Sequence, residues 1–122
     1  MDILIVDDDK SITDVLFDYL NIDYSLNIFN DPIRALECYK SNLNFDAIIT
    51  DFYMPILYGD GLISRILALN PLQSFIIISG LITDKQKDIL HEFKASIQVI
   101  HKPFKLKDIT LALEEIKNKS NI

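Results

Sequence analysis

Short apolar runs alternate along the chain with longer amphipathic stretches, and this pattern predicts the secondary structure. Five runs rich in aliphatic residues predict strands, over residues 3–6, 26–29, 47–50, 75–80 and 97–100. Apolar residues at helical spacing follow each run and predict helices, over about residues 12–20, 32–42, 62–70, 84–94 and 106–116. A strand therefore alternates with a helix from one end of the chain to the other.

This alternation predicts a single α/β domain with a parallel five-stranded sheet and helices on both of its faces. The run 75–80 is the most apolar and is expected inside the sheet. Ser11 is expected to cap the first helix, with Asp14 in its first turn. Several helical side chains are expected to face the core, among them Val15, Leu16, Tyr19, Leu20, Ile33, Leu36, Ile89, Leu90 and Phe93.

Composition narrows the class of protein. The 122 residues are enough for one domain, and 49% apolar with 25% charged residues is an ordinary balance for a globular domain. No apolar run approaches the roughly 18 residues that span a bilayer, and neither a signal peptide nor a membrane partner is expected. The net charge of −6 argues against direct binding of nucleic acid. The single cysteine, Cys38, excludes an internal disulfide and fits a reducing cytoplasm.

Polar side chains stand where four of the predicted strands end. They are Asp7 with Asp8, then Asp51, Ser79 and Lys102. Because parallel strands share one carboxyl edge, these side chains should converge there. Two like charges at about 4 Å repel by roughly 4 kcal/mol at an effective dielectric constant of about 20, and one lysine cannot balance three carboxylates. A hard divalent cation with oxygen ligands, Mg²⁺ above all, would do so, and Mg²⁺ pairs with phosphate.

Four motifs at these strand ends together resemble the receiver domain of two-component response regulators. They are residues 3–9, residues 51–55 with Gly59 and Leu62 beyond, residues 78–80 and residues 102–104. The resemblance covers essentially residues 1–122, of which about 117–122 are expected to form a polar tail or the start of a linker. It implies a doubly wound flavodoxin-like fold with strand order 2-1-3-4-5. Whether an effector domain follows is left open.

The resemblance assigns the acidic residues. Asp51 would accept a phosphoryl group from a sensor histidine kinase or a histidine phosphotransfer protein. Asp7, Asp8 and Asp51 would hold Mg²⁺, together with the backbone carbonyl of Tyr53. The chain would then be a signalling switch and no enzyme beyond its own Mg²⁺-dependent phosphorylation and slow autodephosphorylation.

The resemblance also assigns the remaining site residues. Ser79 would donate its hydroxyl to a phosphoryl oxygen, and Lys102 would pair with the phosphoryl charge. The small Gly80 would leave room for that group, and Pro103 would follow a cis peptide bond. Output would pass through the surface of the fourth helix, the fifth strand and the fifth helix, which could also form a homodimer.

Four positions depart from the family pattern or vary within it. Val99 stands where the family usually has an aromatic residue that reports the switch, and a stiff valine cannot report it by the same swing. Tyr58 replaces a commoner acid or amide. Tyr53 and Leu81 are large and flank the expected path of a hydrolytic water, so the phosphoryl group is expected to be lost slowly.

Two other functions compete with the signalling switch. A phosphatase of the haloacid dehalogenase type needs a second acid two residues after the nucleophile, where this chain has Tyr53. A phosphorylation-independent docking module would need none of the acidic residues, and only Val99 favours it. His91 and His101 have no ligand partner at useful spacing and are not expected to bind metal, while Cys38 is expected in the core.

Overall fold

The computed structural model of the chain describes residues 1–54, 59–93 and 95–120, so Pro55 and Tyr58 lie outside the described residues. The strands are β1 (Asp2–Val6), β2 (Ser25–Phe29), β3 (Ala47–Asp51), β4 (Phe75–Ser79) and β5 (Ile97–His101). The helices are α1 (Lys10–Leu20), α2 (Pro32–Ser41), α3 (Gly59–Leu69), α4 (Asp84–His91) and α5 (Leu106–Ser120). No helix in the described part of the chain is long and apolar enough to cross a membrane.

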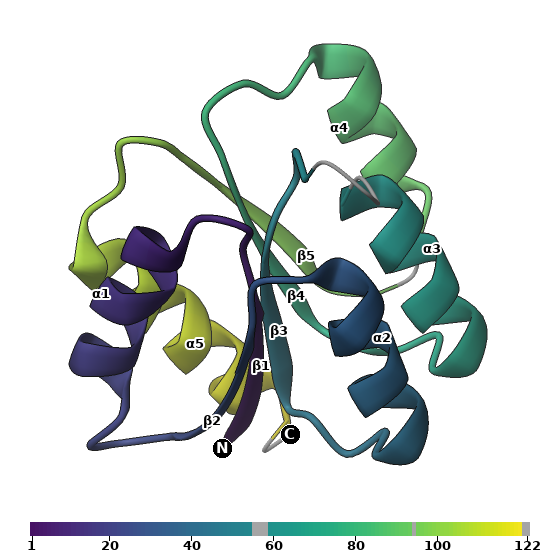
Figure 1. Cartoon of the computed structure of the whole chain (residues 1–122). Coiled ribbons are helices and arrows are strands. Elements are labelled where there is room, and N and C mark those ends of the chain that lie inside the picture. The colour runs from purple at the N-terminus through teal and green to yellow at the C-terminus, as the bar shows by residue number, and fades with distance from the viewer. Residues whose placement is uncertain (55–58, 94, 121–122) are drawn as a thin grey trace.

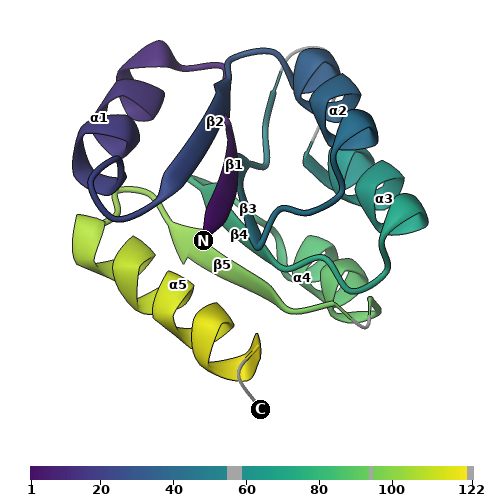
Figure 2. The same cartoon turned by 90° about the horizontal axis from the view of Figure 1, so that it is seen from below.

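All neighbouring strands pair in parallel, in the order β2-β1-β3-β4-β5, which confirms the predicted topology. Figures 1 and 2 show α1 and α5 on one face of the sheet and α2, α3 and α4 on the other. Each face has its own apolar cluster, one including Leu36, Ile63 and Leu90, the other including Leu16, Leu20 and Leu113. Every residue of β3 and β4 is buried, as expected for strands covered on both faces.

The cap of α1 differs from the prediction. Asp9, not Ser11, is the N-cap, and its carboxylate accepts a hydrogen bond from the Ser11 N–H at 2.9 Å. The Ser11 hydroxyl also donates to this carboxylate, and that bond is the main cause that lowers the pKa of Asp9. A carboxylate is a stronger acceptor than a hydroxyl, so the helix starts earlier. Asp14 then lies past the first turn and pairs with Lys10 at 3.0 Å.

Several side chains predicted to face the core are exposed. The exposed fractions are 46% for Val15, 40% for Tyr19 and 45% for Ile89, and Ile33 is also exposed. A helix on a flat sheet buries only a narrow strip, so the outer members of an apolar stripe remain in solvent. Cys38 and Phe93 are partly buried against the core.

Two element boundaries also move inward. The fourth helix ends at His91 and not near residue 94, because Glu92 forms its C-cap, and Lys94 lies outside the described residues. The fourth strand ends at Ser79, so Gly80 belongs to the following loop. Ser79 is therefore the last residue of β4, at the sheet edge where the predicted site lies.

Candidate functional site

The polar residues at the strand ends meet at the carboxyl edge of the sheet, as predicted. Asp7 follows β1, Asp51 ends β3, and the register that pairs Val6 with Thr50 puts the two acids side by side. Lys102 follows β5, and its Nζ lies 3.5 Å from Asp51 Oδ2 and 3.7 Å from Asp7 Oδ2. Both acids are buried, with 2% of Asp7 and 8% of Asp51 exposed. One lysine thus bridges two buried carboxylates.

Backbone donors orient these two carboxylates. Asp7 Oδ1 accepts a hydrogen bond from the Asp9 N–H at 2.9 Å. Asp51 Oδ1 accepts one from the Phe52 N–H at 2.8 Å. With Oδ1 of each group held by the backbone, Oδ2 of each faces the Lys102 ammonium. The local chain path therefore fixes both carboxylates before any ligand binds.

Asp8 completes a group of three carboxylates. One oxygen from each of Asp7, Asp8 and Asp51 lies within 4.8 Å of the others, and Asp8 is exposed where the other two are buried. Burial is the main cause that raises the pKa of Asp7 to about 6, and burial likewise raises the pKa of Asp51, while Lys102 opposes both effects. Clustered carboxylate oxygens that are costly to ionise are the donor set of a hard divalent cation. The residues fit Mg²⁺.

Ser79 is fully buried beside this cluster, but its hydroxyl bonds elsewhere. It donates to the Leu81 carbonyl at 3.1 Å and accepts from the Leu81 N–H at 3.3 Å. Its own carbonyl accepts from the Lys102 N–H at 2.8 Å, and the Lys102–Pro103 peptide bond is cis, as the resemblance implied. A methyl group on Gly80 would meet Lys102 Cβ at 3.9 Å, an ordinary contact, so a small side chain also fits in this state. Ser79 is near the acids without being bonded to them.

Two supporting residues were missed by the sequence analysis. The Asn30 side chain donates to the Asp7 carbonyl at 2.8 Å and to Thr13 Oγ1 at 3.0 Å. Thr13 is buried on α1, so Asn30 ties the end of β1 to that helix. The signal was available, because Asn30 directly follows the second strand at the same edge of the sheet.

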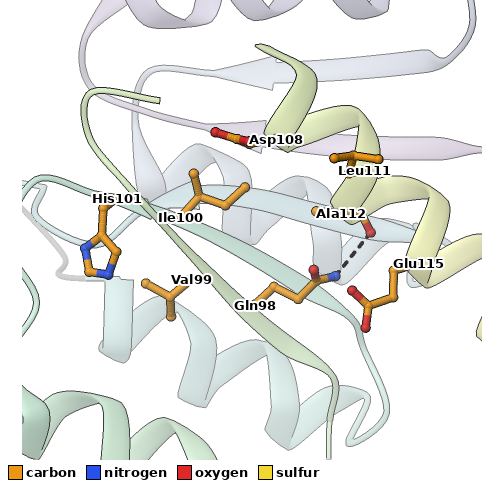
Figure 3. Close-up of a pocket in the computed structure, with 8 residues that line it drawn as sticks. All are labelled: Gln98, Val99, Ile100, His101, Asp108, Leu111, Ala112 and Glu115. Atoms are coloured by element: carbon orange, nitrogen blue, oxygen red, sulfur yellow. Dashed lines mark hydrogen bonds between the residues drawn. The ribbon is translucent and has the colours of Figure 1, made fainter. Parts of the chain in front are cut away.

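Strand β5 borders a groove on one face of the sheet and the apolar cluster on the other. A groove of about 470 Å³ lies between β5 and α5 (Figure 3), where the Gln98 amide donates to the Ala112 carbonyl at 3.1 Å. Val99 is partly buried and packs against the cluster on the other face of the sheet. His101 lies 3.5 Å from Lys87 Nζ. Within the described residues, neither His91 nor His101 belongs to the group of potential metal ligands.

Comparison with known proteins agrees with this geometry. The family model of the response regulator receiver domain matches residues 3–114. A receiver domain protein from Clostridium thermocellum is 25% identical, with a TM-score of 0.87 over 98% of this chain and 96% of that one. The non-phosphorylated HemR receiver domain from Leptospira biflexa is 26% identical, with a TM-score of 0.85 over 94% of this chain and 92% of that one.

A longer relative matches through one part of its sequence. The protein-glutamate methylesterase/protein-glutamine glutaminase 3 of Rhodopseudomonas palustris is 30% identical over 106 residues, or 83% of this chain. The chain spans only 28% of that protein's length. With the family match over most of its length, the chain belongs to the response regulator receiver domains, the signalling domains of two-component systems.

Proposed function

We propose that this chain is a phosphoacceptor switch and that Asp51 accepts the phosphoryl group. The observation that supports this most is the buried Asp51 carboxylate beside both Asp7 and Lys102, with Lys102 Nζ 3.5 Å from Asp51 Oδ2. A carboxylate oxygen of Asp51 forms a bond to phosphorus while the bond from phosphorus to a donor histidine nitrogen breaks, and the electron pair stays on the imidazole. The donor is a sensor histidine kinase or a histidine phosphotransfer protein.

The surrounding charges suit this reaction. An ionised carboxylate needs no general base to attack phosphorus. Asp7, Asp8, Asp51 and the Tyr53 backbone carbonyl would hold Mg²⁺, which when bound would offset the negative charge on the transferred group. Lys102, already beside Asp51, pairs with a phosphoryl oxygen once the acyl phosphate has formed. The Lys102 ammonium, a cation that belongs to the chain itself, thus lies beside Asp51 Oδ2.

Ser79 links the phosphoryl group to the loop that follows β4. A hydroxyl has one proton to donate, and here that proton goes to the Leu81 carbonyl. Donation to a phosphoryl oxygen on Asp51 therefore requires the Ser79 hydroxyl to leave Leu81. The new group adds about −1.5 to −2 of charge if it titrates like other protein phosphates, and that charge attracts both Ser79 and Lys102. Phosphorylation is thereby coupled to the conformation of residues 80–83.

Intact mass after incubation with acetyl phosphate tests this proposal. A single phosphoryl gain is expected in wild type with Mg²⁺, and none in Asp51→Asn or after Mg²⁺ is removed by a chelator. Asp46→Asn, an exposed acid outside the site, is the matched control and should gain one phosphoryl group. No gain in a folded wild-type protein that also fails to bind Mg²⁺ would refute the switch and favour the phosphorylation-independent docking module, which Val99 alone supports.

The lifetime of the acyl phosphate should be long. Tyr53 and Leu81 are 40% and 70% exposed and each lies two residues beyond a site residue. Both are large enough to hinder a water that approaches Asp51. Replacing both with small polar residues should accelerate loss of the phosphoryl group, followed by intact mass over time. An unchanged rate of loss would show that these side chains do not limit access.

The output partner is expected on the surface of α4, β5 and α5, close to Ser79 and Lys102. The groove between β5 and α5 in Figure 3 belongs to this surface, and a second copy of the chain is one occupant that we propose for it. The single cysteine and the absence of any long apolar run agree with a cytoplasmic place of action. The net charge of −6 argues that nucleic acid is not contacted by this domain.

A further inference from the structure

The Tyr53 side chain connects the acidic site to helix α4. Tyr53 lies two residues after Asp51, and its hydroxyl donates a hydrogen bond to Gln86 Oε1 at 3.1 Å. The Tyr53 ring also packs edge-on against the buried Phe52 ring, with ring centroids 5.3 Å apart and ring planes at 77°. The segment that follows β3 therefore contacts α4 through this hydrogen bond.

The acceptor of this bond also caps α4. Thr83 and Gln86 form a capping box, in which the Thr83 N–H donates to Gln86 Oε1 at 2.9 Å and the Gln86 N–H donates to Thr83 Oγ1 at 3.2 Å. An amide oxygen has two lone pairs. In Gln86 the Thr83 N–H takes one and the Tyr53 hydroxyl takes the other. The start of α4 and the bond to Tyr53 thus share an atom.

Among the residues that the structure describes, few other contacts fix the position of α4. Leu90 is the one buried side chain among its eight residues, whereas α1 has three and α2 has four. Ile89 is 45% exposed. Lys87 Nζ and His101 Nε2, 3.5 Å apart, give only a long polar contact to β5. With so little apolar burial, each hydrogen bond at the start of α4 has a large share in holding it.

We propose that Tyr53 is a positioning residue whose hydrogen bond to Gln86 couples the phosphorylation state of Asp51 to α4. This inference rests on the proposed function. When the Ser79 hydroxyl turns from the Leu81 carbonyl to a phosphoryl oxygen, residues 80–83 shift and carry Thr83 and Gln86 with them, so the bond to Tyr53 opens. Val99 has neither ring nor hydroxyl to carry this signal, whereas Tyr53 has both.

Hydrogen exchange of the α4 amides tests the coupling without reference to any partner. Without phosphate donor, Tyr53→Phe should raise exchange in the first turn of α4 about five-fold, since a net hydrogen bond contributes about 1 kcal/mol. The matched control is Tyr19→Phe, because Tyr19 is equally exposed at 40% and its hydroxyl accepts a bond from Thr110 on α5. It should leave α4 exchange unchanged. Gln86→Glu, which keeps the acceptor, should retain protection that Gln86→Leu loses.

The second part compares the proteins with acetyl phosphate and Mg²⁺, at phosphoryl occupancies measured by intact mass. Phosphorylation should raise α4 exchange several-fold in wild type and in Tyr19→Phe, and add little in Tyr53→Phe. An equal rise in Tyr53→Phe and wild type at equal occupancy would overturn the coupling while leaving Asp51 as the phosphoacceptor. A wild type that gains no phosphoryl group would instead refute the proposed function. Unchanged α4 exchange in unphosphorylated Tyr53→Phe would also overturn the coupling.

Discussion

The two sides of the candidate site differ in how firmly they are held. On the β1–β3 side, backbone N–H groups fix Asp7 and Asp51, and both strands lie inside the sheet. On the β4–β5 side, the Ser79 hydroxyl bonds to a loop, α4 has one buried side chain, and β5 is an edge strand without a fully buried residue. The first side presents acids that the backbone orients, and the second is held by fewer buried contacts. Under the proposed function, phosphorylation would take place on the first side and the conformational response on the second.

Truncation of one leucine on each side is the most severe test of this difference. Leu20 on α1 and Leu90 on α4 are 1% and 2% exposed. Leu20→Ala should lower the free energy of unfolding by about 2–5 kcal/mol. Leu90→Ala should lower it by less than half as much, because α4 can detach while the rest stays folded and the loss is then limited to its docking free energy. Urea unfolding monitored by circular dichroism gives both values, and equal losses would remove the distinction between the two sides.

Burial of the Asp7 carboxylate should lower the free energy of unfolding at neutral pH when no Mg²⁺ is bound. Burial raises the pKa of Asp7 from 3.8 to about 6, so between these pH values the folded chain binds a proton that the unfolded chain does not. The contribution of Asp7 to the free energy of unfolding therefore increases as the pH falls through 6, and it decreases again as the pH rises. At pH 7 without Mg²⁺, Asp7→Asn should be more stable than wild type by up to about 3 kcal/mol.

Two controls sharpen the test of Asp7. The stability difference between Asp7→Asn and wild type should shrink toward zero as the pH is lowered through 5 to 4, where both side chains are neutral in the folded protein. Mg²⁺ at pH 7 should stabilise wild type more than Asp7→Asn. Thermal unfolding at each pH, with and without Mg²⁺, measures both effects. A variant less stable than wild type at pH 7 would show that the Lys102 pair outweighs the burial of Asp7.

The smallest expected effect concerns the support behind Asp7. Asn30→Ala removes the bonds to the Asp7 carbonyl and to Thr13 and should cost about 1–2 kcal/mol. It should also weaken Mg²⁺ binding, measured by calorimetry, since Asp7 loses an anchor. The control is Asn27→Ala, in β2 just before Asn30, whose side chain has a 3.9 Å contact to Cys38 Sγ, and it should stay within about 0.5 kcal/mol. Equal effects of the two variants would mean that Asn30 does not support the site.

The strand order was predicted through the resemblance of the four strand-end motifs to receiver domains. The convergence of the acids was predicted from the sequence itself, because parallel strands share one carboxyl edge. The sequence was insufficient where two local interactions compete. Asp9 and Ser11 are both good capping residues, and only the bonds in the structure show that Asp9 is the cap. Exposure of Tyr19 depends on how much of α1 the sheet covers, which helical spacing does not report. The bond of Tyr53 to Gln86 joins residues 33 positions apart, and no local pattern signals it.

The central claim is that Asp51 accepts the phosphoryl group, and chemical trapping tests it most directly. Borohydride reduces an acyl phosphate to an alcohol, which turns the modified aspartate into homoserine and leaves unmodified acids intact. After treatment with acetyl phosphate and Mg²⁺, then borohydride and proteolysis, the account predicts homoserine only in the peptide that contains Asp51. Homoserine at Asp7 or Asp8 instead, or in no peptide of a protein that has gained phosphate, would contradict it.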